Sequence, residues 1–212
     1  MRKRIVIVGT DTNVGKTVFS AALAGALGFS YWKPVQSGLE DETDSATVAR
    51  LAGVASDKIL PEAYRLRLPA SPHIAARAER LVIDPTRLTP PADVKELIIE
   101  TAGGVMVPLT DDLLTIDLLA AWGFPVVLVA RTALGTINHS LLTIEALQRR
   151  HIPILGVAFN GDAEPAPQAT IGALGRVKIL GRLPRLDPPG PETLRAAFAA
   201  AFRVEDFASC AA

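Results

Sequence analysis

Residues 9–17 read Gly9-Thr10-Asp11-Thr12-Asn13-Val14-Gly15-Lys16-Thr17, and this stretch decides the fold. The apolar run 4–8 precedes it, and a helix-like run from Val18 to Ala24 follows it. In a strand, glycine-rich loop and helix of this order, backbone N–H groups and the open helix N-terminus point at one anion. The pattern is typical of a phosphate-binding loop. A glycine-rich turn with an incidental Lys-Thr pair would not need the flanking strand and helix.

Two side chains at the end of the loop carry the chemistry of such sites. We expect Lys16 to reach the outer phosphates of ATP and the Thr17 hydroxyl to hold Mg²⁺. Five residues rather than four separate Gly9 from Gly15, so the loop is one residue longer than the general pattern. The longer spacing reduces the number of families to which the chain can belong.

The composition indicates a folded chain with balanced charge. Its 212 residues include 22 Lys and Arg against 22 Asp and Glu, and 49% are hydrophobic. No linker-like segment divides them, which predicts one domain over residues 1–212. The zero net charge gives no reason to expect a nucleic-acid or membrane partner. The single cysteine, Cys210, cannot form an internal disulfide, so we expect a cytoplasmic protein.

Short apolar runs alternate with helical patterns along the chain. We predict a helix over 45–52, capped by Thr43 or Asp44 and ended at Gly53. Prolines interrupt residues 63–93, where only one short helix near 74–79 is indicated. The alternation predicts an α/β fold, a doubly wound and mostly parallel sheet with helices on both faces. The expected strands, about six, span residues 4–8, 29–32, 96–100, 125–130, 154–159 and 177–180.

Polar side chains stand near the points where several of these strands end. Ligands bind beyond the carboxyl ends of parallel strands, so we expect a cluster there of Lys16, Thr17, Lys33, Asp44 and Glu100. The oxygens of Thr17, Asp44 and Glu100 form a ligand set suited to magnesium. Two simpler interpretations stay open at this point. Glu100 could pair with a surface lysine, and Asp44 could cap its helix.

Lys33 is the more specific of these signals. A lysine inside an apolar run, at a strand end and before a proline, suits an anion better than a solvated surface. Ser37 follows four residues later on a glycine-containing loop, so its hydroxyl and N–H group could reach the same ligand. The sequence therefore places two anion-binding lysines, Lys16 and Lys33, at one edge of the sheet.

Several separate motifs, in this order, resemble those of the dethiobiotin synthetases, and the resemblance covers most of the chain. They are the extended loop 9–17, Lys33-Pro34-Val35 with Ser37-Gly38, Ser71-Pro72-His73, Glu100 with Ala102-Gly103-Gly104, and Leu134-Gly135 with Ile137-Asn138-His139. Such a set is far more specific than one loop. It implies the fold of the P-loop NTPases in a single domain.

The resemblance implies an ATP-dependent carboxylase that uses Mg²⁺ and takes diaminopelargonic acid, CO₂ and ATP as substrates. One amine of the substrate captures CO₂ as a carbamate, and the carbamate attacks the γ-phosphate of ATP. The second amine then closes the ureido ring and displaces phosphate. The resemblance also implies a homodimer in which the substrate site lies at the subunit interface.

The same resemblance assigns roles residue by residue. Lys33 would hold the carbamate, Lys16 would bridge it to the γ-phosphate, and magnesium would be bound by Thr17, Asp44 and Glu100. The nucleotide would contact Asp11, Thr12, Asn13, Val14, Gly15, Lys16, Thr17, Val18, Glu100 and Gly103, with an adenine pocket made by Asn160, Leu183 and Pro184. The substrate would contact Thr12, Lys33 and Ser37 and, from the partner subunit, the helix N-terminus formed by Gly135, Thr136, Ile137 and Asn138.

Two positions depart from the familiar pattern of the family. Asn13 stands where other members carry a glutamate, which removes a negative charge beside the site and could alter metal affinity or amine recognition. Thr101 replaces a glycine in a Glu-Gly-Ala-Gly-Gly run, so we expect a stiffer segment after Glu100. Neither change alters the two lysines or the expected magnesium ligands.

One alternative from the same fold is a partition or positioning ATPase, a nucleotide-switched dimer that acts on DNA or membrane. We would expect such a protein to have an additional lysine early in the loop, where this chain has Thr10-Asp11-Thr12. A glutamine-dependent synthetase would need a second domain, for which 212 residues are too few. A nucleotide-binding module without catalysis would not need Lys33 and Glu100.

Overall fold

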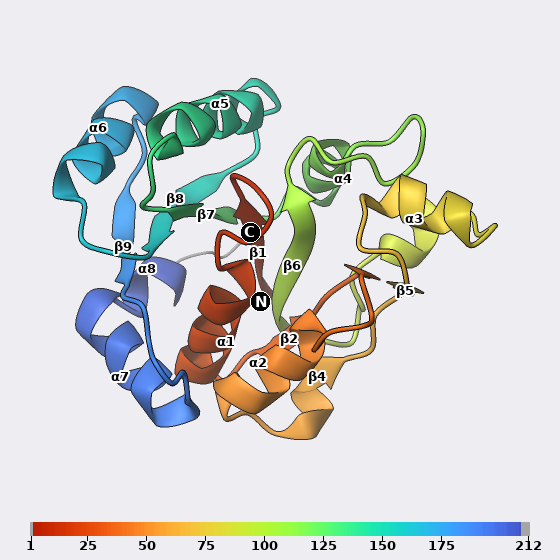
Figure 1. Ribbon diagram of the computed structural model, residues 1–212, viewed down its shortest axis with the longest axis horizontal. Coiled ribbons are helices and arrows are strands. Elements are labelled where there is room, and N and C mark those ends of the chain that lie inside the picture. Colours follow the sequence, from red (N-terminus) through yellow and green to blue (C-terminus); the bar gives the residue numbers. More distant parts are fainter. Residues whose placement is uncertain (1, 209–212) are drawn as a thin grey trace.

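A seven-stranded sheet forms the centre of the computed structural model, which describes residues 2–208 (Figure 1). The strand order is β4-β2-β6-β1-β7-β8-β9, and all neighbouring strands in the described part of the chain are parallel. The strands are β1 (Lys3–Gly9), β2 (Ser30–Trp32), β4 (Ile59–Leu60), β6 (Glu96–Gly104), β7 (Val126–Arg131), β8 (Ile154–Asn160) and β9 (Ile179–Leu183). A smaller parallel sheet pairs β3 (Val35–Ser37) with β5 (Tyr64–Leu66).

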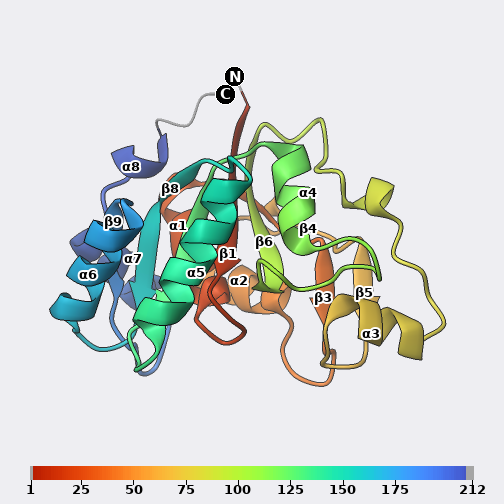
Figure 2. The same ribbon diagram turned by 90° about the horizontal axis from the view of Figure 1, so that it is seen from above.

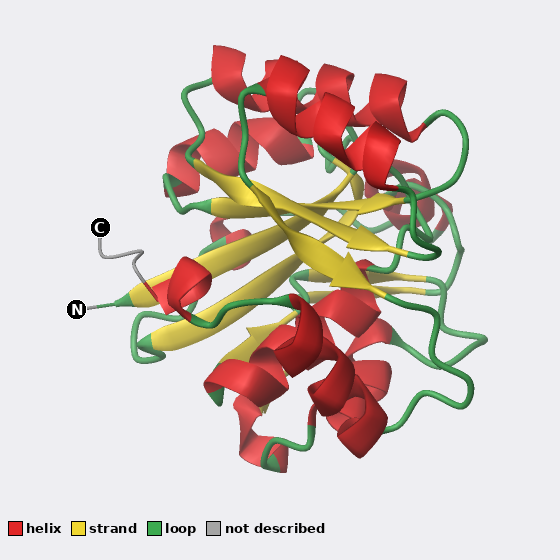
Figure 3. Ribbon diagram, turned by 90° about the vertical axis from the view of Figure 1, so that its left-hand side faces the viewer, coloured by secondary structure: helices red, strands yellow, loops and turns green. Residues whose placement is uncertain are grey.

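Helices cover both faces of the large sheet, as Figure 2 and Figure 3 show. One apolar core joins the sheet to α1 (Lys16–Leu27), α2 (Asp44–Ala52) and α7 (Pro191–Ala201). A second core, on the opposite face, joins it to α4 (Thr115–Trp122), α5 (Thr136–Arg149) and α6 (Pro165–Gly175). Along β1, Ile5 and Ile7 belong to the first core, whereas Val6 and Val8 belong to the second. The predicted doubly wound α/β fold is therefore confirmed.

The small sheet has a core of its own beside the main body. It packs with α3 (Pro72–Ala78) and the short 3-10 helix η2 (Pro85–Leu88) around Val35, Tyr64 and Leu66. The remaining short elements are η1 (Ser56–Lys58) and α8 (Glu205–Ala208). Residues 63–93 thus fold mainly as a satellite core with little regular structure, which explains why their sequence pattern is weak.

Several local predictions are confirmed, and some boundaries were wrong. Thr43 caps α2 by accepting a hydrogen bond from the Ala46 N–H group at 3.3 Å, and Gly53 ends that helix in the left-handed conformation. β6 does not end at Glu100 but continues to Gly104, and the last strand spans residues 179–183 rather than 177–180. The sheet has seven strands rather than about six because the two-residue β4 is too short to give a sequence pattern.

Two observations concern the predicted location of the protein. Among residues 2–208, none of the helices combines the length and the apolar content that a membrane span requires. Cys210, from which a reducing compartment was expected, lies outside the described residues.

The first prediction concerns the aromatic cluster beneath α1. The fully buried ring of Phe198 lies 4.8 Å from Phe202 and 6.3 Å from Phe19. We expect Phe198→Ala to lower the free energy of unfolding by about 3–5 kcal/mol, because a buried aromatic ring is replaced by a cavity. Denaturant unfolding measures the change. The matched control, Phe124→Ala, removes a half-buried ring and should cost clearly less; equal losses would contradict the prediction.

Candidate active site

The phosphate-binding loop joins β1 to α1 through two left-handed residues. Asn13 has φ 57° and Gly15 has φ 90°, and α1 then begins at Lys16. A Cβ atom at Gly15 would lie 2.4 Å from the Asn160 Nδ2 atom, so only glycine fits this position. No side chain caps the helix N-terminus. The first N–H groups of the helix are therefore left without a side-chain cap, as binding of an anion requires.

Asn160, at the end of β8, holds the loop from the neighbouring strand. Its Nδ2 atom donates to the carbonyl oxygens of Val14 at 2.9 Å and Gly15 at 3.0 Å. Its Oδ1 atom is buried and has no hydrogen-bond partner among the described residues. Leu183 is its register partner on β9, and Pro184 follows that strand. The three residues expected in the adenine pocket therefore lie together, with one unused acceptor.

Lys16 lies over the loop and is 6% exposed. Its Nζ atom donates to the carbonyl oxygen of Asp11 at 2.9 Å. Burial, reinforced by the nearby charge of Lys33, lowers the pKa of Lys16 to about 8, although Glu100 and other carboxylates act in the opposite direction. The protonated side chain thus lacks a carboxylate partner of its own. An anionic phosphate nearby would stabilise its charged form.

Thr17, Asp44 and Glu100 converge as expected for a hard-cation site. The Thr17 hydroxyl lies 2.6 Å from Asp44 Oδ1 and 2.9 Å from Glu100 Oε1. Asp44 is the first residue of α2 and not its cap, since Thr43 has that role. The described residues contain no group of three or more His, Cys, Asp or Glu suited to a metal. Two carboxylates and a hydroxyl fit magnesium when phosphate oxygens and water complete its shell.

Lys33 is 3% exposed and uses all three N–H donors of its ammonium group. Its Nζ atom lies 2.7 Å from Asp44 Oδ2, 3.1 Å from Glu100 Oε1 and 3.1 Å from the carbonyl oxygen of Thr101. Burial alone would lower the pKa of Lys33, but the charges of Glu100 and Asp44 outweigh it and the pKa is raised. Glu100 therefore does pair with a lysine, but the pair is buried rather than at the surface.

Two residues that sequence reasoning missed hold Glu100 and Asp44, the first by its carboxylate and the second by its backbone. The Tyr31 hydroxyl donates to Glu100 Oε2 at 3.1 Å, and the Gln36 Oε1 atom accepts from the Asp44 N–H group at 3.1 Å. Tyr31 could have been found, because it precedes Lys33 by two residues in an extended segment and so shares its face. Gln36 gives no comparable signal in the sequence, because its partner Asp44 lies on the other side of a loop.

The residues expected to contact substrate fall into two groups. Thr12 is exposed on the loop near Gly103, where an added Cβ would lie 3.5 Å from the Thr12 hydroxyl. Ser37 ends β3, and its buried hydroxyl has no partner among the described residues. The second group, residues 135–138, forms the N-terminus of α5. The hydrogen bonds and ion pairs found within residues 2–208 do not join this second group to Lys33.

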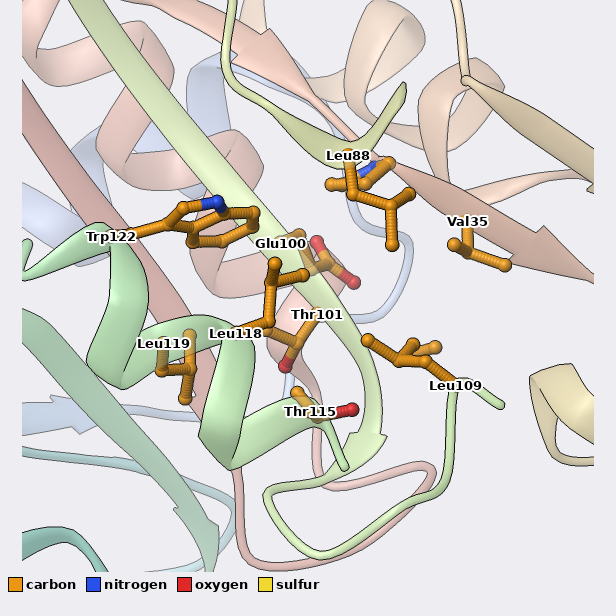
Figure 4. A pocket seen from close by; sticks show the side chains of 11 residues that line it. Val35, Leu88, Glu100, Thr101, Leu109, Thr115, Leu118, Leu119 and Trp122 are labelled. Atoms are coloured by element: carbon orange, nitrogen blue, oxygen red, sulfur yellow. The ribbon is translucent and has the colours of Figure 1, made fainter. Parts of the chain in front are cut away.

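A small cavity lies between α4 and the small sheet, over β6 (Figure 4). Its wall includes Leu88, Thr101, Leu119 and Trp122, and its volume is about 20 Å³. The cavity is mostly apolar and too small for a nucleotide or a nine-carbon diamine. It is therefore not the binding site for either ligand, although it shares Glu100 and Thr101 with the cluster around Lys33.

The second prediction concerns Asn160. We expect Asn160→Asp to weaken ATP binding at least about tenfold, because a carboxylate cannot donate to the two loop carbonyls and repels them. Titration calorimetry with ATP and magnesium measures the dissociation constant. Asn138→Asp, the same exchange at the exposed N-terminus of α5, should leave it unchanged. The prediction is wrong if the two variants bind ATP equally well.

Comparisons with known proteins agree on the family. A family model described as an AAA domain matches residues 3–193. A protein of Rhizorhabdus wittichii named ATP-dependent dethiobiotin synthetase BioD is 62% identical over 208 residues, which cover 98% of this chain and 100% of that protein. A protein of the same name from Rhodopseudomonas palustris is 59% identical over 207 residues, which cover 98% of each chain.

Solved structures share the fold at much lower identity. A ParA family ATPase from Chlorobium tepidum is 14% identical with a TM-score of 0.59, and the match covers 94% of this chain and 91% of that one. The MinC:MinD cell division protein complex of Aquifex aeolicus gives 16% identity and a TM-score of 0.57, with 97% and 93% covered. Likeness at this level supports the nucleotide-binding fold alone. The full-length sequence relatives show more: this chain belongs to the family of the ATP-dependent dethiobiotin synthetases.

Proposed function

We propose that this chain is an ATP-dependent dethiobiotin synthetase that joins CO₂ to 7,8-diaminopelargonic acid and closes the ureido ring. One observation carries the proposal: the buried Lys33 ammonium lies among the carboxylates beside the phosphate-binding loop. A purely nucleotide-binding protein has no need of a second buried lysine at this place. The name of the full-length relatives, 56–62% identical, supports ATP-dependent synthesis of dethiobiotin.

ATP would bind with its phosphates in the loop and its adenine between β8 and β9. Lys16 and the N–H groups of the α1 N-terminus would contact the outer phosphates. The unpaired Oδ1 atom of Asn160 would accept a hydrogen bond from the adenine amino group. The buried Leu183 and the adjacent Pro184 would supply an apolar wall for the ring.

The carboxylates beside the loop would hold magnesium together with Thr17. Asp44 and Glu100 offer four oxygens, and two of them already converge on the Thr17 hydroxyl. When bound, Mg²⁺ would neutralise part of the charge on the ATP phosphates. Tyr31 orients the Glu100 carboxylate, and Gln36 holds the backbone of Asp44 at the start of α2.

The chemistry proceeds through a carbamate and a mixed anhydride. One amine of the substrate adds to CO₂ and loses a proton, and Lys33 holds the resulting carbamate anion. A carbamate oxygen attacks the γ-phosphorus with ADP as leaving group, while Lys16 spans the two anions. The second amine then attacks the carbonyl carbon and displaces phosphate, which closes the ring. Two lysines beside the loop suit these steps because the carbamate and the ATP phosphates that must meet are both anionic.

We further propose a cytoplasmic homodimer of single-domain chains, with the substrate carboxylate bound at the N-terminus of α5 of the partner. The four residues 135–138 stand at a helix N-terminus that suits an anion, and the buried Thr136 hydroxyl has no partner among residues 2–208. The adjacent Leu134 is fully exposed, and Leu142 on α5 is 58% exposed. Unpartnered apolar side chains beside these residues support an interface there.

The decisive experiment detects dethiobiotin by mass spectrometry. Purified protein is given ATP, magnesium, bicarbonate and diaminopelargonic acid, and phosphate release is followed in parallel. We expect product and phosphate in equal amounts. If DNA or lipid stimulates phosphate release and no dethiobiotin forms, the result would instead favour the function of a partition or positioning ATPase. This chain resembles such proteins in fold.

The third prediction tests the role of Lys33. We expect Lys33→Ala to abolish product formation while ATP binding is retained, because the carbamate loses its cation and the loop is untouched. The change also leaves Asp44 and Glu100 without their buried partner, which should cost about 3–5 kcal/mol of stability. Circular dichroism and ATP calorimetry establish that the variant is folded. Lys178→Ala, which removes an exposed lysine paired with Asp206 far along the chain from the loop, is the control and should retain activity.

Product formation by folded Lys33→Ala at nearly the wild-type rate would exclude the carbamate role. Loss of product in both lysine variants would show that the assay reports general damage rather than the site.

The fourth prediction tests the shared site. Lys33→Ala and Asn138→Asp should each be nearly inactive, the second because a carboxylate repels the substrate carboxylate. After subunit exchange in an equal mixture, about a quarter of the wild-type activity should return, because half of the dimers are mixed and each has one intact site. Native mass spectrometry of differently tagged chains verifies the exchange. If exchanged mixtures remain as inactive as the separate variants, the site does not combine residues of two subunits.

A further inference from the structure

Thr101 makes two contacts that link the end of β6 to the site. Its backbone carbonyl oxygen accepts a hydrogen bond from Lys33 Nζ at 3.1 Å. Its side-chain hydroxyl donates to the carbonyl oxygen of Ile7 on β1 at 3.3 Å. The residue is 6% exposed. Thr101 therefore connects β1, which leads into the phosphate-binding loop, with Lys33, which lies on the other side of β6.

The pairing of β1 with β6 does not orient the backbone carbonyl group of Thr101. β1 and β6 pair Ile7 with Glu100, but the next pair is Gly9 with Gly104, so the register shifts between them. Residues 101–103 lie within this irregularity, opposite Val8 alone. In such a bulge the backbone is free of the regular pairing that would otherwise orient its carbonyl groups. The hydroxyl of Thr101 supplies a tie to β1 that replaces it.

The Thr101 side chain also lines the small cavity below α4. Figure 4 shows Thr101 with Leu118, Leu119 and Trp122 of α4 in the wall of this cavity. A volume of about 20 Å³ is enough for a water molecule, so packing against α4 does not by itself hold the side chain. The hydrogen bond to Ile7 is therefore the contact that restricts Thr101.

The carbonyl of Thr101 differs in kind from the other two partners of Lys33. Asp44 and Glu100 are charged, and both are proposed ligands of magnesium, so their contacts with the ammonium group are open to competition. The Thr101 carbonyl is neutral and has no such second role. It is the one acceptor of the three that remains dedicated to Lys33 when ligands occupy the site.

We propose that Thr101 is a positioning residue for Lys33, which acts by fixing the carbonyl group that aims the ammonium at the reacting carbamate. This inference rests on the proposed function. The carbonyl is a backbone group that a glycine could also supply, but a glycine lacks the side chain that orients it. Thr101 therefore adds to this chain a restraint that the glycine of the familiar family motif would not provide.

The test uses three variants of the full chain. Thr101→Val keeps the shape and removes the hydroxyl, and Thr101→Ser keeps the hydroxyl. The matched control is Thr115→Val, because Thr115 is also buried, lines the same cavity and donates its hydroxyl to a backbone carbonyl, that of Val107 at 2.9 Å. Thr115 has no contact with Lys33 among those found in residues 2–208, so its variant reports the structural cost of losing such a hydroxyl.

The first readout needs no substrate. Nuclear magnetic resonance of the protein with ¹⁵N-labelled lysine measures the hydrogen exchange of the Lys33 ammonium group. We expect about fivefold faster exchange in Thr101→Val and wild-type exchange in Thr101→Ser and Thr115→Val. Equal exchange in Thr101→Val and the wild type would overturn the proposal, as would equal acceleration in both valine variants.

The second readout is steady-state formation of dethiobiotin. We expect Thr101→Val to lower kcat about tenfold with an unchanged KM for ATP, since the reacting group is misaimed while the loop is intact. Thr101→Ser should restore kcat, and Thr115→Val should retain it. If the wild type forms no dethiobiotin, the proposed function fails, whereas the ammonium exchange still decides whether Thr101 positions Lys33. A tenfold rise in the KM for ATP with unchanged kcat would contradict the inference.

Discussion

The buried ammonium group of Lys33 is the interaction on which the site depends. It connects three segments that are distant in the sequence: the end of β2, the start of α2 and the end of β6. Removing such a charge from water costs several kcal/mol, and only an arrangement that satisfies all its N–H groups offsets this cost. Asp44, Glu100 and the Thr101 carbonyl complete that arrangement. Under the proposed function, the groups that allow this charge to be buried are also the groups that would meet the ligands, so stability and function would share the same residues.

The strand order explains why these groups meet at the phosphate-binding loop. β6 lies between β2 and β1, although the chain visits it long after both. Glu100 and Thr101 on β6 therefore contact Lys33 on one side, and β6 pairs with the strand of the loop on the other. The chain also turns from one side of β1 to the other after β6, which is where open parallel sheets bind ligands. Glu100 and Thr101 couple the two halves of the site because of this topology.

The sequence predicted those parts of the fold and site in which the signal is local. The loop 9–17, the capped helix after Thr43 and the buried position of Lys33 follow from spacing and hydrophobic pattern, and the structure agrees. Residues 63–93 could not be predicted in detail, because their small sheet depends on pairing with residues 35–37. The contact of Gln36 with the backbone of Asp44 was missed for a similar reason. Gln36 reaches Asp44 across a loop, and no periodicity in the sequence records a contact of that kind.

Neutral and charged groups have different tasks in this arrangement. Asn160 holds the loop, Tyr31 holds the Glu100 carboxylate, Gln36 holds the backbone N–H group of Asp44, and the Thr101 carbonyl holds Lys33. The neutral member of each contact carries no charge for which a nucleotide or metal would compete. Under the proposed function, Lys33 and Glu100 can exchange one ionic partner for another while each keeps a neutral hydrogen bond. Preorganisation of this kind lowers the cost of rearranging polar groups during the reaction, because the frame is set during folding. The charges then need only to exchange partners within that frame.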